Sequence, residues 1–194
     1  MKSICVFCGA NFNGDEVLSQ AIEQLAKKMV AGNISLVFGG GKVGVMGMLA
    51  DAVLSRGGKA IGIMPQFLID KEVAHSGLTE LHIVKSMHER KQLMSELSDG
   101  IITLPGGLGT LEEYFEALTW LQLGLHQNPV GLLNINGFYD LLLQQLDVME
   151  QQKFLKPANR KLVLSSASID DLFEQMENFS SKPEEVWYNK NGLK

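Results

Sequence analysis

The sequence predicts an α/β fold: a Rossmann-like, doubly wound parallel sheet of about six or seven strands with helices on both faces. Short apolar runs alternate with longer stretches of helical periodicity, and strands that are apolar throughout are typical of parallel sheets buried on both faces. Glycine-rich stretches follow two of these runs, at strand ends where such sheets bind ligands. The 194 residues suit one domain, which we place at 1–180, with a polar tail at 181–194.

The first half of the chain begins with the strand SICVF at 3–7. The stretch 15–32 keeps its apolar residues on one helical face and stops at a glycine, which predicts a helix. ISLVF at 34–38 is the second strand, and after a glycine-rich loop a second helix runs to about Arg56. A third strand at 59–64 ends at a proline.

The middle of the chain starts with an irregular stretch at 66–79, followed by a fourth strand at 80–85. Residues 86–99 form a helix that opens with S-x-x-E, the pattern of a capping box. The fifth strand lies at 100–104, and a helix from about 110 to 123 follows it.

The last part of the domain contains a sixth strand at 129–135 and two helices, at 138–153 and near 168–179. The tail that follows is polar apart from Trp187 and Tyr188. No linker, repeat or low-complexity segment divides the chain.

Charge and hydropathy argue against two kinds of partner. A formal net charge of −5 disfavours a generally cationic nucleic-acid binder. No apolar run reaches the roughly 18 residues that span a bilayer, and the N-terminus turns polar too soon for a signal peptide. We therefore expect a cytoplasmic protein without nucleic-acid or membrane partners.

Cys5 and Cys8 have the C-x-x-C spacing of redox and zinc sites. On a strand, however, side chains three residues apart point to opposite faces, and no second pair completes a zinc site. The histidines form no ligand spacing either. We expect two buried small residues, and no metal or cofactor.

The loop GGGKVG at 39–44 carries Gly39, Gly40, Gly41 and Gly44. It fits G-x-G-x-x-G, the fingerprint of dinucleotide sites. It follows the second strand rather than the first, however, and no acid for a ribose ends the next strand. Two interpretations stay open: close packing of the loop against the sheet, or room for part of a ligand.

A second glycine-rich stretch, PGGLGTLEEYF, opens the helix near residue 110. Gly106, Gly107 and Gly109 permit positive φ and close backbone approach. Their N–H groups, the hydroxyl of Thr110 and the positive end of the helix dipole can converge on one phosphate.

Glu112 and Glu113 are unexpected beside a phosphate. In a first helical turn each stabilises the helix by roughly 0.3–1 kcal/mol, and Thr110-x-x-Glu113 spells a capping box, yet both charges repel an anion. This conflict indicates that one glutamate acts on a ligand. For Glu112 the helix dipole is the only role that the sequence suggests.

Arg90 and Lys91 stand in the first turns of the 86–99 helix, whose start lies at the same edge of the predicted sheet. A basic pair on a helix is often simply solvated, but its position at the carboxyl ends of the strands favours an anion site. Gln92 stands where a zinc-protease motif needs its second histidine.

MHERK at 87–91 and PGGLGTLEE at 105–113 together resemble the Lonely Guy (LOG) family, cytokinin riboside 5′-monophosphate phosphoribohydrolases often mislabelled lysine decarboxylases. The signatures P-G-G-x-G-T-x-x-E and M-x-x-R-K are matched at each fixed position. VFCGAN after the first strand and GGGxxGxMG at 39–47 also look like the family, so the resemblance covers about 2–180.

The resemblance implies hydrolysis of a purine riboside 5′-monophosphate, cytokinin-type or AMP, to free base and ribose 5-phosphate. It implies Arg90 and Glu113 as the catalytic pair, no cofactor, and a homodimer in which residues of both subunits approach each site. The substrate-binding residues that it implies are Glu72, Met87, Lys91, Gly106, Gly107, Gly109, Thr110 and Thr119.

Elementary chemistry agrees with these roles. Breaking a ribosyl C–N bond builds positive charge on the sugar, which a preorganised carboxylate stabilises. Because helical side chains lean toward the N-terminus, Glu113 can face a sugar whose phosphate lies on the loop. Arg90 could orient Glu113, hold the nucleotide or assist the departing base.

The alternative function is a non-catalytic nucleotide carrier or sensor of the same fold. The presence of both Arg90 and Glu113 favours the enzyme. A pyridoxal-phosphate decarboxylase would need a Schiff-base lysine, for which Lys42 and Lys91 are poor candidates. Prenylated adenine nucleotides and plain AMP both stay open as substrates.

Overall fold

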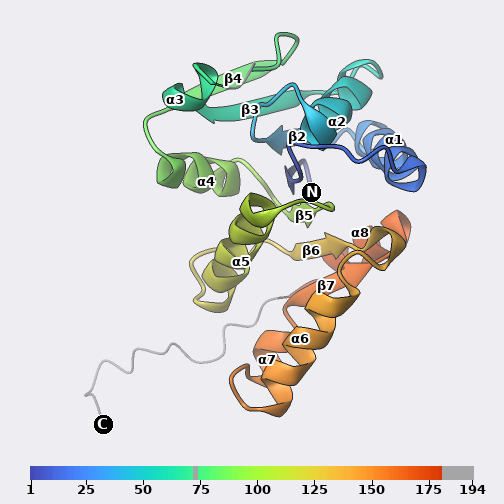
Figure 1. The fold of residues 1–194 in the computed structure, drawn as a ribbon, viewed down its shortest axis with the longest axis vertical. Coiled ribbons are helices and arrows are strands. Elements are labelled where there is room, and N and C mark those ends of the chain that lie inside the picture. The colour runs from blue at the N-terminus through green and yellow to red at the C-terminus, as the bar shows by residue number, and fades with distance from the viewer. Residues whose placement is uncertain (72–73, 181–194) are drawn as a thin grey trace.

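A computed structural model describes residues 1–71 and 74–180 and contains one seven-stranded sheet (Figure 1). The predicted site residue Glu72 and the predicted tail at 181–194, with Trp187 and Tyr188, lie outside the described residues.

All strand pairs in the sheet are parallel, and their order is β4-β3-β2-β1-β5-β6-β7. The strands are β1 Ser3–Phe7, β2 Ser35–Phe38, β3 Ala60–Pro65, β4 Glu80–Val84, β5 Ile101–Thr103, β6 Val130–Leu133 and β7 Val163–Ser166. The order reverses between β1 and β5, so the doubly wound prediction is confirmed, and this reversal is where such sheets bind ligands.

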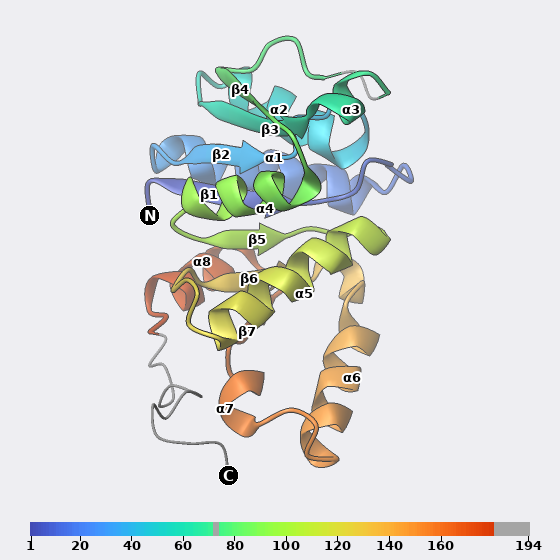
Figure 2. The ribbon, with the colours of Figure 1, turned by 90° about the vertical axis from the view of Figure 1, so that its left-hand side faces the viewer.

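Helices cover both faces of the sheet. They are α1 Glu16–Ala31, α2 Gly44–Leu54, α3 Gln66–Ile69, α4 Met87–Glu96, α5 Leu108–Gln122, α6 Asp140–Gln151, α7 Pro157–Arg160 and α8 Ile169–Glu177, with a 3-10 turn η1 at Ile135–Gly137. Apolar residues of α1, α2 and α8 form one core cluster with the sheet, and those of α4, α5 and α6 form the other. Figure 2 shows α4 and α5 side by side on one face.

The two cysteines confirm the predicted strand geometry. Cys5 belongs to the α4–α5 cluster and Cys8 to the α1–α2 cluster, and both thiols are free and buried. Burial raises the pKa of each thiol, with the negative charge of Glu113 adding to the rise. They are packing residues, as expected.

Three elements differ from the sequence expectation. The short helix α3 occupies the start of the stretch predicted to be irregular, and α7 and β7 lie in a region where we predicted no element. β7 is an edge strand of four residues, of which only Val163 is buried. A strand so short and so little apolar carries almost no pattern of its own.

The start of α5 corrects the predicted capping box. The helix begins at Leu108 with Gly107 as N-cap, so Thr110 is already inside the first turn and does not cap. Thr110 is buried because Gly106, which lacks a Cβ, leaves room for it: a Cβ there would come 2.2 Å from the hydroxyl. Glu113 is therefore free of any capping role.

The capping box predicted for α4 is half confirmed. The hydroxyl of Ser86 accepts a hydrogen bond from the N–H of Glu89 at 3.2 Å. The carboxylate of Glu89 accepts from the N–H of Lys85 at 2.8 Å, one residue before the usual partner. None of the helices within the described residues is long and apolar enough to cross a membrane.

Candidate active site

A pocket of about 600 Å³ opens at the carboxyl ends of β1 and β5, where the strand order reverses. Its walls are the loop after β1, the first turns of α1, α2, α4 and α5, and part of the segment before α6. The lining residues are 8–13, Leu18, Val45, Met46, Met87, Arg90, Phe138 and most of 105–113.

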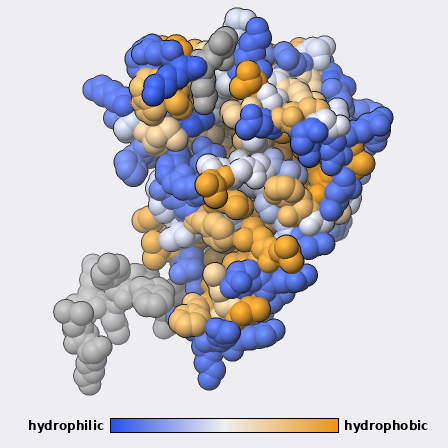
Figure 3. Space-filling view, in the orientation of Figure 1, coloured by the Kyte–Doolittle hydropathy of each residue, from blue (hydrophilic) through white to orange (hydrophobic). Residues whose placement is uncertain are grey.

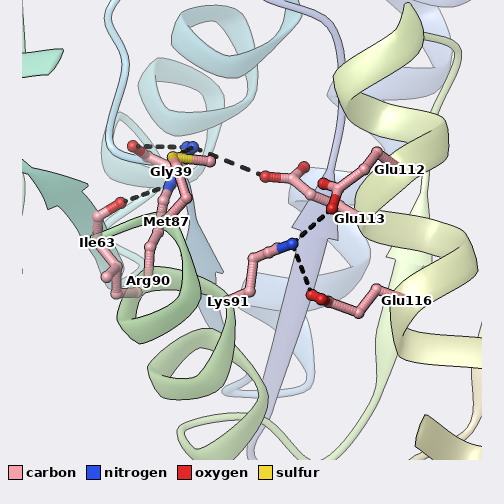
Figure 4. Close-up of polar contacts among 8 residues, drawn as sticks. All are labelled: Gly39, Ile63, Met87, Arg90, Lys91, Glu112, Glu113 and Glu116. Carbon is pink, nitrogen blue, oxygen red and sulfur yellow. Dashed lines mark hydrogen bonds and ion pairs between the residues drawn. The ribbon is translucent and has the colours of Figure 1, made fainter. Parts of the chain in front are cut away.

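Arg90 lies buried at the edge of this pocket, held by the backbone of the sheet (Figure 4). Its Nε donates to the carbonyl of Ile63 on β3 at 3.1 Å, and its Nη2 donates to the carbonyl of Gly39 at 3.2 Å. Its Nη1 lies 3.8 Å from the sulfur of Met87 and 3.7 Å from Oε1 of Glu113. The guanidinium thus has a fixed position and presents its remaining edge to Glu113.

The loop at 39–44 serves this arrangement through close packing. A Cβ on Gly39 would lie 1.9 Å from Nη2 of Arg90, so only glycine leaves room for the guanidinium. Gly40 and Gly44 have φ of +79° and +62°, and a Cβ on Gly44 would come 2.3 Å from the backbone of Ala10. Gly41 forms a backbone bridge to Ala74. Of the two interpretations of this loop, packing is the one that the described residues support.

Glu113 faces Arg90 from the first turns of α5, with a side chain that is 13% exposed. Burial raises its pKa from the ordinary 4.5 to about 6; the Arg90 guanidinium opposes this rise and Glu112 adds to it. A carboxyl group with a pKa near 6 is mostly ionised at neutral pH yet poorly solvated, which is typical of carboxylates that act on a substrate.

Lys91 makes a second set of ion pairs beside the first. Its Nζ lies 2.5 Å from Oε1 of Glu112 and 2.8 Å from Oε2 of Glu116, and its side chain is 8% exposed. Burial opposes its charge, but the hydrogen bonds to the two glutamates outweigh that effect and raise its pKa. Lys91 is not among the residues that line the pocket. A lysine held as an ammonium ion is a poor Schiff-base nucleophile.

The N-terminus of α5 is open to the pocket. Its N-cap Gly107 offers no side chain to the first N–H groups of the helix, which are ordinarily satisfied by a cap, water or a ligand. None of Gly106, Gly107 and Gly109 has a positive φ, so the backbone does not use the conformational freedom that glycine permits there. A Cβ on Gly107 or Gly109 would meet nothing within 4 Å. Nothing within the described residues therefore requires glycine at these two positions, which points to room for a ligand.

The remaining predicted residues differ in their placement. Met87 and Thr110 line the pocket. Thr119 is exposed and lies about 13 Å of helix rise beyond Thr110 on α5. Its hydroxyl donates to the carbonyl of Phe115 at 2.6 Å, and the residue does not line the pocket. Lys42 is exposed and lies outside the lining as well.

The sequence analysis assigned no site role to two parts of the wall, although VFCGAN, which overlaps the first of them, was part of the family resemblance. The loop 9–13 contributes five consecutive lining residues, and Phe138 contributes an aromatic ring from beyond β6. The signal for the loop was its place after the first strand, which the topology puts at the point of reversal. Phe138 has no local signal, because it reaches the pocket only through tertiary packing.

Comparison with known proteins gives a family match and relatives over most of the chain. The family model described as possible lysine decarboxylase matches residues 46–176. The probable cytokinin riboside 5′-monophosphate phosphoribohydrolase LOGL1 of Oryza sativa subsp. japonica is 43% identical over 183 residues, covering 94% of this chain and 82% of that protein. Cytokinin riboside 5′-monophosphate phosphoribohydrolase LOG1 of Arabidopsis thaliana is 40% identical over 190 residues, covering 98% and 89%.

Solved structures with the same fold are more distant in sequence. A molybdenum cofactor binding protein from Rippkaea orientalis superposes with a TM-score of 0.65 at 23% identity, covering 91% of this chain and 96% of that one. The molybdenum cofactor carrier protein of Chlamydomonas reinhardtii gives 0.61 at 18% identity, covering 89% and 98%. At these identities the likeness concerns the fold alone.

Proposed function

The chain belongs to the Lonely Guy (LOG) family of cytokinin riboside 5′-monophosphate phosphoribohydrolases, and from this premise we propose that it hydrolyses a purine riboside 5′-monophosphate to free base and ribose 5-phosphate. The observation that carries the proposal is the buried pair of Arg90 and Glu113 beside the uncapped, glycine-rich start of α5. The start of α5 suits a phosphate, and the carboxylate of Glu113 suits a ribosyl cation.

In the proposed complex the 5′-phosphate binds at the start of α5. Gly106, Gly107, Gly109 and Thr110 surround it, and the helix dipole and free N–H groups favour its charge. The absence of any steric need for glycine at 107 and 109 supports this assignment. Met87 packs against the nucleotide from the start of α4.

The sugar then lies beside Glu113, which is roughly 4–5 Å of helix rise beyond Thr110. As the bond from C1′ to the base nitrogen breaks, positive charge builds on the sugar, and the Glu113 carboxylate stabilises it. A water oxygen bonds to C1′, the leaving nitrogen keeps the electron pair of the broken bond, and one water proton ends on the base. Arg90, always cationic, keeps Glu113 ionised and oriented.

The base in this complex faces the apolar wall of the pocket. The lining residues Leu18, Val45 and Met46 are buried, and the lining residues Phe12 and Phe138 are exposed. An adenine with or without an apolar N6 substituent fits the character of such a wall, so AMP and isopentenyl-AMP are the two substrates to compare.

We also propose that the chain acts as a homodimer. Large apolar side chains are exposed at Leu125 (69%), Leu141 (79%) and Phe154 (85%), and Figure 3 shows hydrophobic residues gathered in the middle and lower part of one face. Such surfaces mark interfaces in soluble proteins. Light scattering after size exclusion tests the proposal, and a monomer at micromolar concentration would contradict it.

The test of the enzyme is direct. We expect the protein to release free base and ribose 5-phosphate from AMP or isopentenyl-AMP, measured by chromatography. In Glu113→Gln we expect turnover to fall roughly 10²- to 10³-fold, with AMP binding retained by calorimetry. Glu174→Gln, an exposed glutamate on α8, is the matched control and keeps full activity. Binding of nucleotide without release from any purine or pyrimidine monophosphate would instead identify a carrier or sensor.

A further inference from the structure

Two sets of ion pairs run side by side between α4 and α5 (Figure 4). Arg90 and Lys91 are neighbours on α4, and Glu112 and Glu113 are neighbours on α5. Arg90 faces Glu113 at 3.7 Å. Lys91 lies between Glu112 and Glu116, at 2.5 Å and 2.8 Å.

The lysine of the second set is buried to an uncommon degree. The side chain of Lys91 is 8% exposed, whereas those of its partners Glu116 and Glu112 are 23% and 55% exposed. Lysine is almost never buried unless it is paired, and removal of one partner of a buried pair is strongly unfavourable. The two glutamates therefore hold this ammonium group in place, and it in turn connects α4 to α5.

We propose that Lys91 is a positioning residue, whose bridge to Glu112 and Glu116 holds α4 against α5 so that Arg90 faces Glu113. This inference rests on the proposed function, and it gives Lys91 a different role from the substrate contact that the family resemblance implies. It follows from the position of the ammonium group, which is outside the lining of the pocket and within bonding distance of two carboxylates.

The same bridge accounts for the two negative charges at the start of a phosphate-binding helix. Glu112 lines the pocket next to Glu113, where an uncompensated carboxylate would repel a phosphate. Because Lys91 pairs with Glu112, this charge is compensated locally.

The charges around Glu113 decide what removal of Lys91 does. Arg90 and Lys91 face it from α4, Glu112 and Glu116 lie on its own helix, and the buried thiols of Cys5 and Cys8 on and after β1 are neutral. Without Lys91 two carboxylates beside Glu113 lose their partner, and its carboxyl group ionises less readily.

The experiment measures kcat and KM for AMP between pH 5.5 and 8.5. In Lys91→Met we expect kcat to fall roughly 10- to 100-fold at pH 8, because Arg90 and Glu113 lose their alignment. At pH 6 we expect a further loss of about fivefold, because a rise of about one unit in the pKa of Glu113, from about 6, lowers the ionised fraction at this pH from about a half to about a tenth. KM for AMP changes less than about threefold.

Two further variants separate the effect of the positive charge at residue 91 from the effect of the ion pairs that connect α4 and α5. Lys91→Arg keeps the charge and restores the wild-type pH profile. The triple variant Lys91→Met, Glu112→Gln, Glu116→Gln removes the stranded carboxylates, so we expect its pH profile to be normal while kcat stays low at every pH.

Three results would overturn the inference. A rise in KM alone, with an unchanged pH profile, would make Lys91 a substrate contact. Wild-type kcat in Lys91→Met would make the bridge dispensable. The titration of the Glu113 carboxyl group can be monitored by carbon-13 NMR, with the signal assigned by its loss in Glu113→Gln. If the pH midpoint of this titration is the same in Lys91→Met as in the wild type, Lys91 has no electrostatic effect on Glu113. The NMR titration needs no turnover, so it tests the bridge even if the wild type releases no base.

Discussion

Replacement of Glu113 by glutamine is expected to stabilise the fold at neutral pH while it removes activity. The carboxyl group is buried beside Arg90, and burial raises its pKa to about 6. Glutamine has nearly the same shape, keeps an oxygen toward the guanidinium and carries no charge. The variant therefore removes the desolvated charge and little else.

The size of the effect follows from the two pKa values. The ordinary value is 4.5 and the folded value is about 6, and a difference of about 1.5 corresponds to about 2 kcal/mol. Between these pH values the folded protein retains a proton that the unfolded chain has released. The free energy of unfolding of the wild type therefore falls as pH rises from about 4.5 through 6. The glutamine variant lacks this loss.

Urea unfolding at pH 4, 5, 6 and 7.5 measures the prediction. We expect the stability of Glu113→Gln relative to wild type to increase by about 2 kcal/mol between pH 4 and 7.5, with most of the change between 4.5 and 6. Glu174→Gln removes the same formal charge from an exposed position and should show a nearly constant difference. A flat or declining difference for Glu113→Gln would mean that Arg90 outweighs burial, and the reasoning from desolvation would then be wrong.

Three further predictions test the glycines and the thiols. In Gly109→Ala the added methyl group meets no neighbour within 4 Å and the residue lies in a helix, so we expect the free energy of unfolding in urea to rise by about 0.4–1 kcal/mol. We expect the dissociation constant for AMP to rise about tenfold or more, and tighter binding would contradict a phosphate at this position. Gly39→Ala displaces the Arg90 guanidinium and lowers kcat by roughly 10²-fold, measured by base release, and retention of full activity would show that Arg90 need not occupy this site. Cys5 and Cys8 are buried with raised pKa, so neither reacts with a thiol reagent at pH 8 until urea unfolds the chain, and fast labelling of the folded protein would refute their burial.

Several features were predictable because they depend on local pattern. Five of the seven strands have apolar runs long enough to recognise, and β4 mixes apolar and polar residues. The alternation of strands and helices allows few arrangements other than a doubly wound sheet. The buried cysteines followed from the period of a strand alone. The edge strand β7 was not predictable, because its four residues are short and half-buried and are recruited by pairing with β6.

The start of α5 shows where local rules fail. Thr110-x-x-Glu113 has every mark of a capping box, and helix propensity disfavours glycine inside a helix. The helix nevertheless begins at Leu108. Thr110 is buried against Gly106, a tertiary contact that helix propensities do not include. Because the helix starts before Thr110, Glu113 takes no part in capping and faces Arg90.

The sequence by itself determined the fold class and the family, and it singled out Arg90, Thr110 and Glu113, which line the pocket, because these are written in periodicity and in two short motifs. Only the tertiary structure decided how these residues are arranged. Gly39 makes room for a guanidinium, burial moves the pKa of Glu113 toward 6, and Lys91 pairs with Glu112 and Glu116 instead of lining the pocket. Ion pairing and desolvation depend on distances between residues about twenty to fifty positions apart, and these distances exist only once α4 and α5 have packed on the same face of the sheet.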